Sequence, residues 1–457
     1  MKLHRILIAN RGEIALRVIR TCRKLGIETV LAVSDADLDS APARLADIAI
    51  RVGPPPAAQS YLHVERIMAA AKAVKADAIH PGYGFLSENA RLARAAKEAE
   101  IIFIGPDETH LASVGDKLQA RDHAVAAGLP VVPGGPVDDA EAALALAGEI
   151  GFPVLIKAVG GGGGRGMRRV KEGSEMKPAV NLAMAEAEAA FGDARIYIER
   201  FVERGRHIEV QLLGDGRGNV IHLGERDCSI QRRYQKLVEE APAPDLHPKL
   251  RSSICEAAVR FGRHLKYRNA GTVEFLVDIN RNEFYFLEMN ARIQVEHPVT
   301  EAITGLDLIA EQIWIAERNE LRLTQNAVRF SGHAIECRIN AENPADDFRP
   351  SPGAVIRALF PAGEGVRVDT HIESGAHVPP FYDSLLAKII AHGKNREEAL
   401  IRMKLALRNC VLEGVDTNVS THAGLMSRSE FIDGGVTTDF LPAFLARTPR
   451  LSVTEVA

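Results

Sequence analysis

The stretch GTVEFLVDINRNEFYFLEMNARIQVEHPVTE, residues 271–301, contains two glutamates and an asparagine whose spacing suggests chemistry: Glu274, Glu288 and Asn290. TVEFLVD and FYFLEMN read as strands, and INRNE reads as the turn between them. A turn centred on Arg281 places Glu274 opposite Glu288, with Asn290 on the same face. Such oxygens repel one another unless a cation neutralises them, and Mg²⁺, which usually bridges to nucleotide phosphates, prefers them as ligands. The alternative is a solvated sheet face with lysine partners, although the run between the glutamates is strongly apolar.

The same alternation carries three more polar residues onto this face if the strand stays extended beyond Asn290: Arg292, Gln294 and Glu296. An arginine can hold a planar anion through two parallel hydrogen bonds, and a neighbouring carboxylate can act as a general base. A salt bridge between Arg292 and Glu296 is the structural alternative, and it is compatible with both roles.

A lysine followed by glycines marks a second candidate site, in KAVGGGGGRGMRRV at residues 157–170. Lys157 ends an apolar strand, and bare backbone N–H groups beyond it could approach an anion closely. No G-K-[ST] follows, so this is not a Walker A loop. The pattern predicts either a phosphate flap that closes over a nucleotide or a flexible surface loop.

Basic residues crowd the stretch ERDCSIQRRYQKLVEEAPAP at residues 225–244. They are Arg226, Arg232, Arg233 and Lys236. The cluster could bind phosphates or pair with Glu239 and Glu240, and the sequence favours neither. His207 in a predicted strand and Arg338 in ECRINAE are, taken alone, more typical of structural roles than of catalysis.

Strands and helices alternate in the first quarter of the chain. The strand-like runs are RILIA (5–9), IETVLAV (27–33), ADAIHPGYGF and AEIIFIG, with helical, alanine-rich stretches between them. This alternation predicts a doubly wound α/β domain over residues 1–114, with a parallel sheet and helices on its faces.

The rest of the chain mixes strands and helices differently. Residues 115–330 contain helical patterns at 116–127 and 175–191, then strands joined by short turns, which favours antiparallel pairing. Residues 331–446 read as short strands followed by a helix near 395–412, a third domain of mixed α+β type.

Composition excludes several classes of function. Hydrophobic residues make up 46% of the 457 residues and charged residues 25%, with a net charge of −4, so neither nucleic acid nor an anionic membrane is an expected partner. Five scattered cysteines without a C-x-x-C pair argue against a disulfide framework or zinc site and favour a reducing, cytoplasmic setting. No signal-peptide pattern opens the chain.

Many motifs together resemble the biotin carboxylase family of ATP-grasp ligases. The matching runs are IANRGEIALRVIR, IHPGYGFLSENA, FIGP, GDK, IKAVGGGGGRGM, RHIEVQ, ERDCSIQRRYQK, VEEAPAP, EFYFLEMNARIQVEHPVTE, HAIECRINAE, PSPG and PPFYDSLLAKII. The resemblance implies an N-terminal domain at 1–114, an ATP-grasp domain at 115–330 with a mobile lid at about 132–203, and a C-terminal domain at 331–446. It implies that ATP with Mg²⁺ or Mn²⁺ and bicarbonate form carboxyphosphate, which yields carbon dioxide for N1 of biotin.

The resemblance also assigns roles to residues of this sequence. ATP binding falls to Lys117, Lys157, Gly162, Gly163, Gly164, Glu199, Arg200, Val202, His207, Gln231, Tyr234, Glu274, Leu276 and Glu288. The metal ligands are Glu274, Glu288 and Asn290. The bicarbonate pocket is Lys236, Arg292, Gln294, Val295 and Glu296. The biotin subsite is Tyr83, Gly84 and Arg338.

Four of these residues are expected to be catalytic: Lys236, Arg292, Glu296 and Arg338. Glu296 matches the base that deprotonates bicarbonate, and Arg338 matches the arginine that steadies the biotin enolate. The chain departs from many relatives at Tyr234, where they have histidine. This difference matters because a phenol, unlike an imidazole, does not titrate near neutral pH. It also has Arg200-Phe201 where lysine-tyrosine is common, but the contacts expected there involve the backbone.

The expected partners follow from the same resemblance. A biotinyl lysine usually lies in an M-K-M turn, and EMKP (175–178) and RMKL (402–405) lack the second methionine. Biotin is therefore expected on a separate biotin carboxyl carrier protein, with carboxyltransferase subunits completing an acetyl-CoA carboxylase for fatty acid synthesis. Subunits serving propionyl-CoA, methylcrotonyl-CoA or pyruvate are alternatives. A homodimer is implied, with Arg17 and Arg20 as candidate interface residues.

Three other functions are alternatives to this one. Another ATP-grasp carboxylate ligase would share the metal hairpin and the glycine flap, but not RIQVEHP together with Arg338. A nicotinamide-dependent oxidoreductase is disfavoured because NRGEIA lacks G-x-G-x-x-G. A regulatory protein that only retains ATP is disfavoured because the proposed catalytic residues are present.

Overall fold

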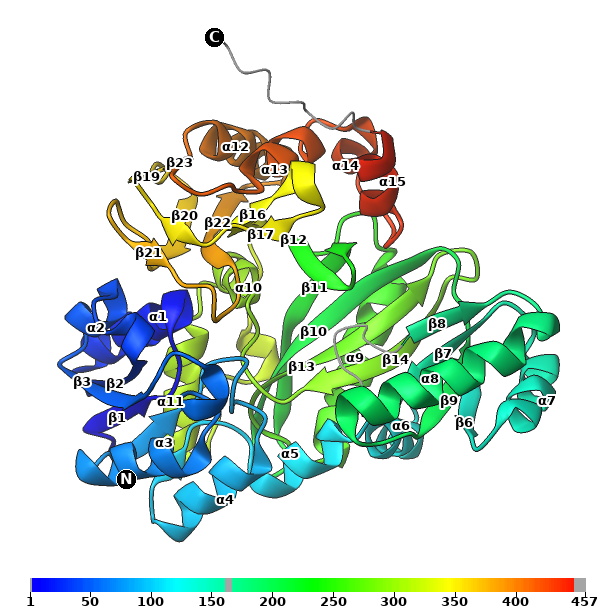
Figure 1. The fold of residues 1–457 in the computed structure, drawn as a ribbon, viewed down its shortest axis with the longest axis horizontal. Coiled ribbons are helices and arrows are strands. Elements are labelled where there is room, and N and C mark those ends of the chain that lie inside the picture. The colour runs from blue at the N-terminus through cyan, green and yellow to red at the C-terminus, as the bar shows by residue number, and fades with distance from the viewer. Residues whose placement is uncertain (1, 161–166, 448–457) are drawn as a thin grey trace.

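A parallel five-stranded sheet forms the N-terminal part of the computed structural model, which describes residues 2–160 and 167–447 (Figure 1). Its strands are β1 (Arg5–Ile8), β2 (Glu28–Ser34), β3 (Ile48–Gly53), β4 (Ala78–His80) and β5 (Ile102–Phe103), in the order β3-β2-β1-β4-β5. The predicted parallel sheet is confirmed. The edge strand β3 was missed, because its apolar run is only three residues long, 48–50, and is largely exposed.

Helices cover both faces of this sheet. They are α1 (Gly12–Leu25) and α11 (Leu308–Arg318) on one face, and α3 (Val64–Ala73) and α4 (Ala90–Glu98) on the other. Successive residues of a strand point to opposite faces, so Ile6 and Ile8 pack with α1 while Leu7 packs with α3. The doubly wound arrangement thus follows from β1 being apolar on both sides.

An eight-stranded antiparallel sheet runs through the middle of the molecule. Its order is β14 (Glu283–Asn290), β13 (Arg268–Asp278), β10 (Gly205–Asp215), β11 (Val220–Arg232), β12 (Gln235–Ala241), β15 (His333–Asn340), β22 (Leu385–Gly393) and β20 (Val366–Thr370). The predicted antiparallel pairing is confirmed. Because β15 pairs with β12, the sheet continues across the expected domain boundary at residue 331.

The faces of this sheet differ in chemistry. Along β10, Ile208, Val210 and Leu212 point into the core beneath α9 (Pro248–His264). The alternate residues, His207, Glu209 and Gln211, therefore lie on the opposite face. That polar face carries the candidate site.

A smaller unit of sheet and helices protrudes from the large sheet, at the right of Figure 1. Its elements are β6 (Gly134–Val137), α7 (Ala140–Ile150), β7 (Val154–Ala158), β8 (Met167–Val170), α8 (Met176–Phe191) and β9 (Ile196–Arg200). It has a core of its own, and the sheet order is β6-β9-β7-β8. At Gly134 a Cβ would lie 2.1 Å from the Ile198 carbonyl oxygen, so only glycine permits this pairing of β6 with β9.

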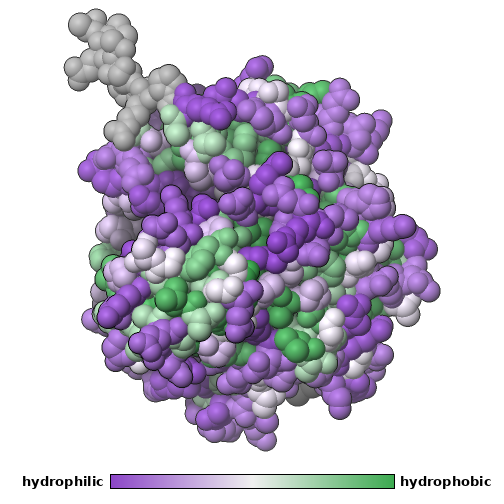
Figure 2. All heavy atoms as spheres, turned by 90° about the vertical axis from the view of Figure 1, so that its right-hand side faces the viewer, coloured by the Kyte–Doolittle hydropathy of each residue, from purple (hydrophilic) through white to green (hydrophobic). Residues whose placement is uncertain are grey.

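The remaining elements connect and cover these sheets. The helices are α2 (Ala41–Leu45), α5 (Glu108–Gly115), α6 (Lys117–Ala126), α10 (His297–Thr304), α12 (Arg396–Arg408), α13 (Val419–Leu425), α14 (Ser429–Asp433) and α15 (Phe440–Arg447). The short strands are β16 (Glu342–Asn343), β17 (Arg349–Pro350), β18 (Gly353–Ala354), β19 (Arg357–Leu359), β21 (His377–Val378) and β23 (Val411–Glu413). Within residues 2–160 and 167–447, no helix combines the length and apolarity needed to cross a bilayer. All five cysteines are free and buried. The face of the molecule in Figure 2 is mainly hydrophilic, with scattered apolar groups.

Candidate active site

The hairpin of β13 and β14 pairs the two predicted acidic residues. Glu274 lies opposite Glu288, as predicted, while the end of the hairpin pairs Asp278 with Glu283. A turn with that last pair would by itself set Glu274 opposite Leu287. A β-bulge next to Glu274 leaves Leu287 without a partner and restores the predicted register.

The acidic pair belongs to a row of charges that crosses four strands. Arg226 on β11 pairs in register with Glu209 on β10, Glu209 with Glu274 on β13, and Glu274 with Glu288 on β14. Arg226 is fully buried, and its guanidinium donates to Glu209 and, at 2.9 Å, to Gln294. Glu209 was not predicted as a site residue, although the alternation in RHIEVQ puts it on the face of His207.

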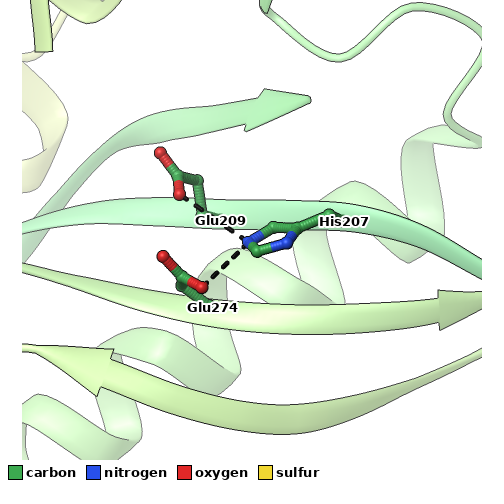
Figure 3. A group of neighbouring side chains, drawn as sticks. All are labelled: His207, Glu209 and Glu274. Carbon is green, nitrogen blue, oxygen red and sulfur yellow. Dashed lines mark ion pairs between the residues drawn. The ribbon is translucent and has the colours of Figure 1, made fainter. Parts of the chain in front are cut away.

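Cations gather at the middle of this row. Lys236 Nζ lies 2.8 Å from Glu274 Oε1 and also donates to Glu209. His207 Nε2 lies 3.0 Å from Glu274 Oε2, and Figure 3 shows dashed lines from the His207 imidazole to Glu209 on the same strand and to Glu274 on the next. Burial would raise the pKa of Glu274, but Lys236 and His207 lower it by more. Burial would lower the pKa of His207, but Glu274 raises it above its usual value.

The end of the row at Glu288 remains short of positive charge. Burial and the negative charge of Glu274 raise the pKa of Glu288, which means that its ionised form lacks a sufficient counter-charge. Asn290 lies next to this pair and donates to Glu274 Oε1 at 2.8 Å. The Asn290 oxygen, Oδ1, accepts from Arg292 Nη2 at 2.7 Å. Carboxylate and amide oxygens are the ligands that Mg²⁺ prefers, so Glu274, Glu288 and, once its amide turns, Asn290 could hold a divalent cation.

The chain does not stay extended after this row, so the condition for strand alternation to bring Arg292, Gln294 and Glu296 to this face is not met. Strand β14 ends at Asn290, and an irregular loop, 291–296, leads into α10. The loop still returns Gln294 to the site, where its amide donates to Glu274 Oε1 at 2.8 Å. Arg292 pairs with Glu88, Nε to Oε2 at 2.9 Å, and not with Glu296, the partner in the structural alternative. Glu88 lies in the quoted run IHPGYGFLSENA, but nothing in that run indicated the contact.

Glu296 lies between two cations. Its Oε1 accepts from Lys236 Nζ at 2.6 Å, and its Oε2 accepts from Arg338 Nη2 at 2.8 Å. Burial would raise the pKa of Glu296, but Lys236 and Arg338 lower it well below its usual value. Arg338 also donates through Nε to Glu239 Oε1 at 2.6 Å, so two carboxylates hold its guanidinium in place.

A cleft of about 1320 Å³ collects most of the predicted residues from distant parts of the chain. It is lined by Tyr83, Gly84, Lys117, Lys157, His207, Gln231, Tyr234, Lys236, Glu274, Glu288, Asn290, Arg292, Gln294, Val295, Glu296 and Arg338. Four predicted nucleotide contacts are not part of this lining: Glu199, Arg200, Val202 and Leu276. Gly162, Gly163 and Gly164 lie outside the described residues.

Glu199 contacts two basic residues near the predicted nucleotide site, Lys157 and Arg121. Its carboxylate is buried and accepts from Lys157, and Arg121 lies 3.4 Å from its other oxygen. The Glu199 side chain therefore points toward the predicted phosphate lysine, which itself lines the cleft. Val202 and Leu276 instead pack around Gly205, where a Cβ would lie 2.7 Å from Leu276 Cδ1.

The basic cluster on β11 and β12 divides into different roles. Arg226 and Lys236 both form ion pairs with Glu209 in the row of charges, whereas Arg232 and Arg233 both pair with Asp347. The cluster does not make the alternative pairing with Glu239 and Glu240: Glu239 accepts from Arg338, and Glu240 accepts from Arg396 and His333.

Tyr234 lies in the two-residue turn that joins β11 to β12. Both turn residues have left-handed backbone conformations, with φ of 48° at Arg233 and 66° at Tyr234, as a type I′ hairpin turn requires. The Tyr234 side chain is 56% exposed at the edge of the cleft. The phenol thus stands at the mouth of the cleft, away from the buried charges.

Comparisons with known proteins agree along the whole chain. Family models match as the biotin carboxylase N-terminal domain at residues 2–111, the carbamoyl-phosphate synthase L chain ATP-binding domain at 116–324, and the biotin carboxylase C-terminal domain at 336–443. A biotin carboxylase from Nostoc is 52% identical, covering 96% of this chain and 99% of that protein. A pyruvate carboxylase subunit from Methanothermobacter thermautotrophicus is 49% identical, covering 96% of this chain and 90% of that protein.

Solved structures give the same result. The Campylobacter jejuni biotin carboxylase in complex with a β,γ-ATP ligand has a TM-score of 0.94 and 44% identity, covering 97% of this chain and 99% of that one. The biotin carboxylase domain dimer of Hydrogenobacter thermophilus 2-oxoglutarate carboxylase, with MgADP and bicarbonate, has a TM-score of 0.93 and 45% identity, covering 97% and 98%. With this identity over nearly its whole length, the chain belongs to the biotin carboxylase family.

Proposed function

We propose that this protein uses ATP and bicarbonate to carboxylate biotin on a carrier protein, as the first half-reaction of acetyl-CoA carboxylase. The observation that carries this proposal is Glu296, held at 2.6 Å by Lys236 and at 2.8 Å by Arg338, beside a metal-competent row of carboxylates. The residues proposed as the base, as the anion-binding cations and as the Mg²⁺ ligands all line one cleft. That combination suits activation of a small carboxylate by a nucleotide better than it suits hydride transfer.

The site residues then divide the work. Lys236 and Arg292 supply positive charge for bicarbonate, and the loop 291–296 brings Gln294 and Val295 to the same place. Although burial would raise the pKa of Glu296, Lys236 and Arg338 lower it and so make Glu296 a weak base. A bound anion that draws Lys236 toward itself would raise the proton affinity of Glu296, so binding of bicarbonate would activate the base. Mg²⁺ bound at Glu274, Glu288 and Asn290 would neutralise the phosphate oxygens of ATP.

Arg338 is proposed to act in the second step of the reaction, the carboxylation of biotin. Its guanidinium is the cation nearest Glu296 on the side of β15, and Tyr83 and Gly84 line the same cleft. A fixed positive charge there would stabilise the negative charge that develops on the ureido oxygen of biotin.

The nucleotide end is proposed to close during the reaction. Lys157 and Lys117 line the cleft, and Lys157 is held by Glu199 in the ligand-free protein. Closure of a lid, about residues 132–203, would exclude water that otherwise hydrolyses carboxyphosphate. We propose domain boundaries at about 114 and 330, with the central sheet shared by the second and third domains.

The proposed partners are a biotin carboxyl carrier protein, carboxyltransferase subunits and a second copy of this chain, in the cytoplasm. The relatives include both biotin carboxylases and a pyruvate carboxylase subunit, so the acceptor depends on the transferase that accompanies the chain. For the homodimer, Arg20 is 51% exposed on α1, whereas Arg17 is buried in ion pairs with Glu301 and Asp307. Arg20 is therefore the better candidate for a contact between the two copies.

An activity assay tests the proposed function. The protein should release ADP in a bicarbonate-dependent reaction that free biotin stimulates, and carboxylated biotin should be detected by mass spectrometry. Arg338→Gln should keep bicarbonate-dependent ADP release but lose most of the carboxylated biotin, because its cation serves the second step. No effect of biotin, together with no carboxylated product from the wild-type protein, would refute the proposal.

A further inference from the structure

Lys388 is a buried lysine that none of the roles above explains. It lies on β22, opposite Arg338 of the neighbouring strand β15, and its side chain is fully buried. A buried ammonium group is costly unless acceptors satisfy its three N–H donors. Its contacts should therefore reveal why the position carries a charge instead of an apolar side chain.

The ammonium group of Lys388 contacts both sides of the cleft. Nζ donates to the main-chain oxygen of Val295 at 2.8 Å and lies 3.1 Å from Glu13 Oε1. Glu13 is itself buried and accepts a hydrogen bond from the hydroxyl of Tyr83. The contacts form a continuous chain from Tyr83 through Glu13 and Lys388 to the loop that carries Val295 and Glu296.

The surrounding charges leave Glu13 as the carboxylate that pairs with Lys388. Asp369 lies opposite Lys388 on β20, but Arg367 holds it with two hydrogen bonds of 3.0 and 2.6 Å. Glu336 is buried on β15, and neither of its carboxylate oxygens has a hydrogen-bond partner in the described chain. Burial raises the pKa of Glu13, and the charge of Lys388 opposes that rise.

The contact with Val295 acts on the base through the backbone. The carbonyl of Val295 and the N–H of Glu296 belong to one planar peptide unit. Holding that carbonyl therefore fixes the orientation from which the Glu296 side chain departs. No regular strand pairing holds this loop, since β14 ends at Asn290. The hydrogen bond from Lys388 is thus a tether between the loop and the central sheet.

We propose that Glu13 and Lys388 are positioning residues that couple the biotin subsite at Tyr83 to the bicarbonate loop at Val295 and Glu296. This inference rests on the proposed function. A change at Tyr83 should then alter the handling of bicarbonate, and the effect should require Lys388. A tyrosine that only contacted biotin would not have this consequence.

A double-mutant cycle with Tyr83→Phe and Lys388→Met tests the coupling in the full-length protein. KM and kcat for bicarbonate, free biotin and MgATP are measured from ADP release and carboxylated biotin. Because a hydrogen bond to a charged group is lost, Lys388→Met should raise KM for bicarbonate about tenfold and leave KM for MgATP within about twofold. Tyr83→Phe should raise KM for bicarbonate about threefold, and the double variant should match Lys388→Met alone.

Arg396→Met is the matched control, because Arg396 also pairs with a buried glutamate, Glu240, and donates to main-chain oxygens. Unlike the partners of Lys388, none of these partners lines the cleft. Arg396→Met should lower the melting temperature without changing KM for bicarbonate. If Lys388→Met does not fold, Glu13→Gln replaces it in the same cycle. Additive effects on KM for bicarbonate, or an effect of Tyr83→Phe on biotin alone, would overturn the coupling. An inactive wild-type protein would instead remove the proposed function and the coupling together.

Discussion

Replacing Glu288 by glutamine should stabilise the ligand-free protein while impairing its use of magnesium. Glu288 faces Glu274 across β13 and β14, and Cβ atoms of such pairs lie about 5 Å apart. At that distance two like charges repel by about 3 kcal/mol when the effective dielectric constant is about 20. Glu288 is half-buried and lines the cleft, so water screens part of this repulsion, and we expect a net gain of about 1–2 kcal/mol in the free energy of unfolding.

The gain should depend on pH in a defined direction. The pKa of Glu288 is raised in the folded protein, so the folded state binds this proton more tightly than the unfolded state does. The wild-type protein therefore loses stability as pH rises from the unfolded pKa of about 4.3 through the higher folded pKa. The advantage of Glu288→Gln should be small in acid and reach its full value above the folded pKa.

Urea denaturation in the presence of a chelator measures the stability, and a magnesium titration of ADP release measures the function. The magnesium needed for half-maximal activity should rise at least about tenfold, since even supporting groups of metal sites have effects of that size. Glu283→Gln is the control, because Glu283 faces Asp278 across the same two strands but is exposed. It should change stability by less than about 0.5 kcal/mol. Lower stability of Glu288→Gln, or an unchanged magnesium requirement, would refute the assignment of this pair as a metal site.

Three further predictions concern other parts of the molecule. Arg226→Met should cost about 3–5 kcal/mol in urea denaturation, because it leaves the fully buried Glu209 without that partner. Asp107→Ala should cost about 1 kcal/mol by removing the N-cap of α5, whose N–H groups at Thr109 and His110 bond Asp107 Oδ1. Burial would raise the pKa of Asp107, but the His110 contact lowers it, so its contribution is present above about pH 4 and is lost as pH falls. Lys157→Met should raise KM for MgATP far more than KM for bicarbonate.

Each of these has a matched comparison. Arg195→Met removes an exposed ion pair with Asp193 and should cost less than about 1 kcal/mol. Asn395→Ala removes the neutral N-cap of α12 and should cost as much in acid as at neutral pH. Equal losses for the buried and exposed arginines, or acid-independent loss for Asp107→Ala, would contradict the reasoning. For Lys157→Met, equal changes in KM for MgATP and KM for bicarbonate would contradict the reasoning.

The sequence located the local parts of this protein well. Apolar runs predicted four of the five strands of the parallel sheet and the hairpin of β13 and β14, because such patterns depend only on neighbours along the chain. It missed β3, whose outer half is exposed, but it placed the end of β14 correctly at Asn290. The predicted pairing of Glu274 with Glu288 was right. It depends, however, on a β-bulge at Leu287, which no pattern in the sequence indicated.

Residue types and spacings therefore determined which chemistry this chain can perform, since carboxylates on alternate strand positions share a face wherever the strand lies. The tertiary structure decided which charges meet. Glu88 holds Arg292 across 204 positions of sequence separation, and Lys388 reaches Val295 across 93. Contacts over such separations arise from the order of strands in the sheets, and that order is set by packing of the whole chain, which no local pattern encodes.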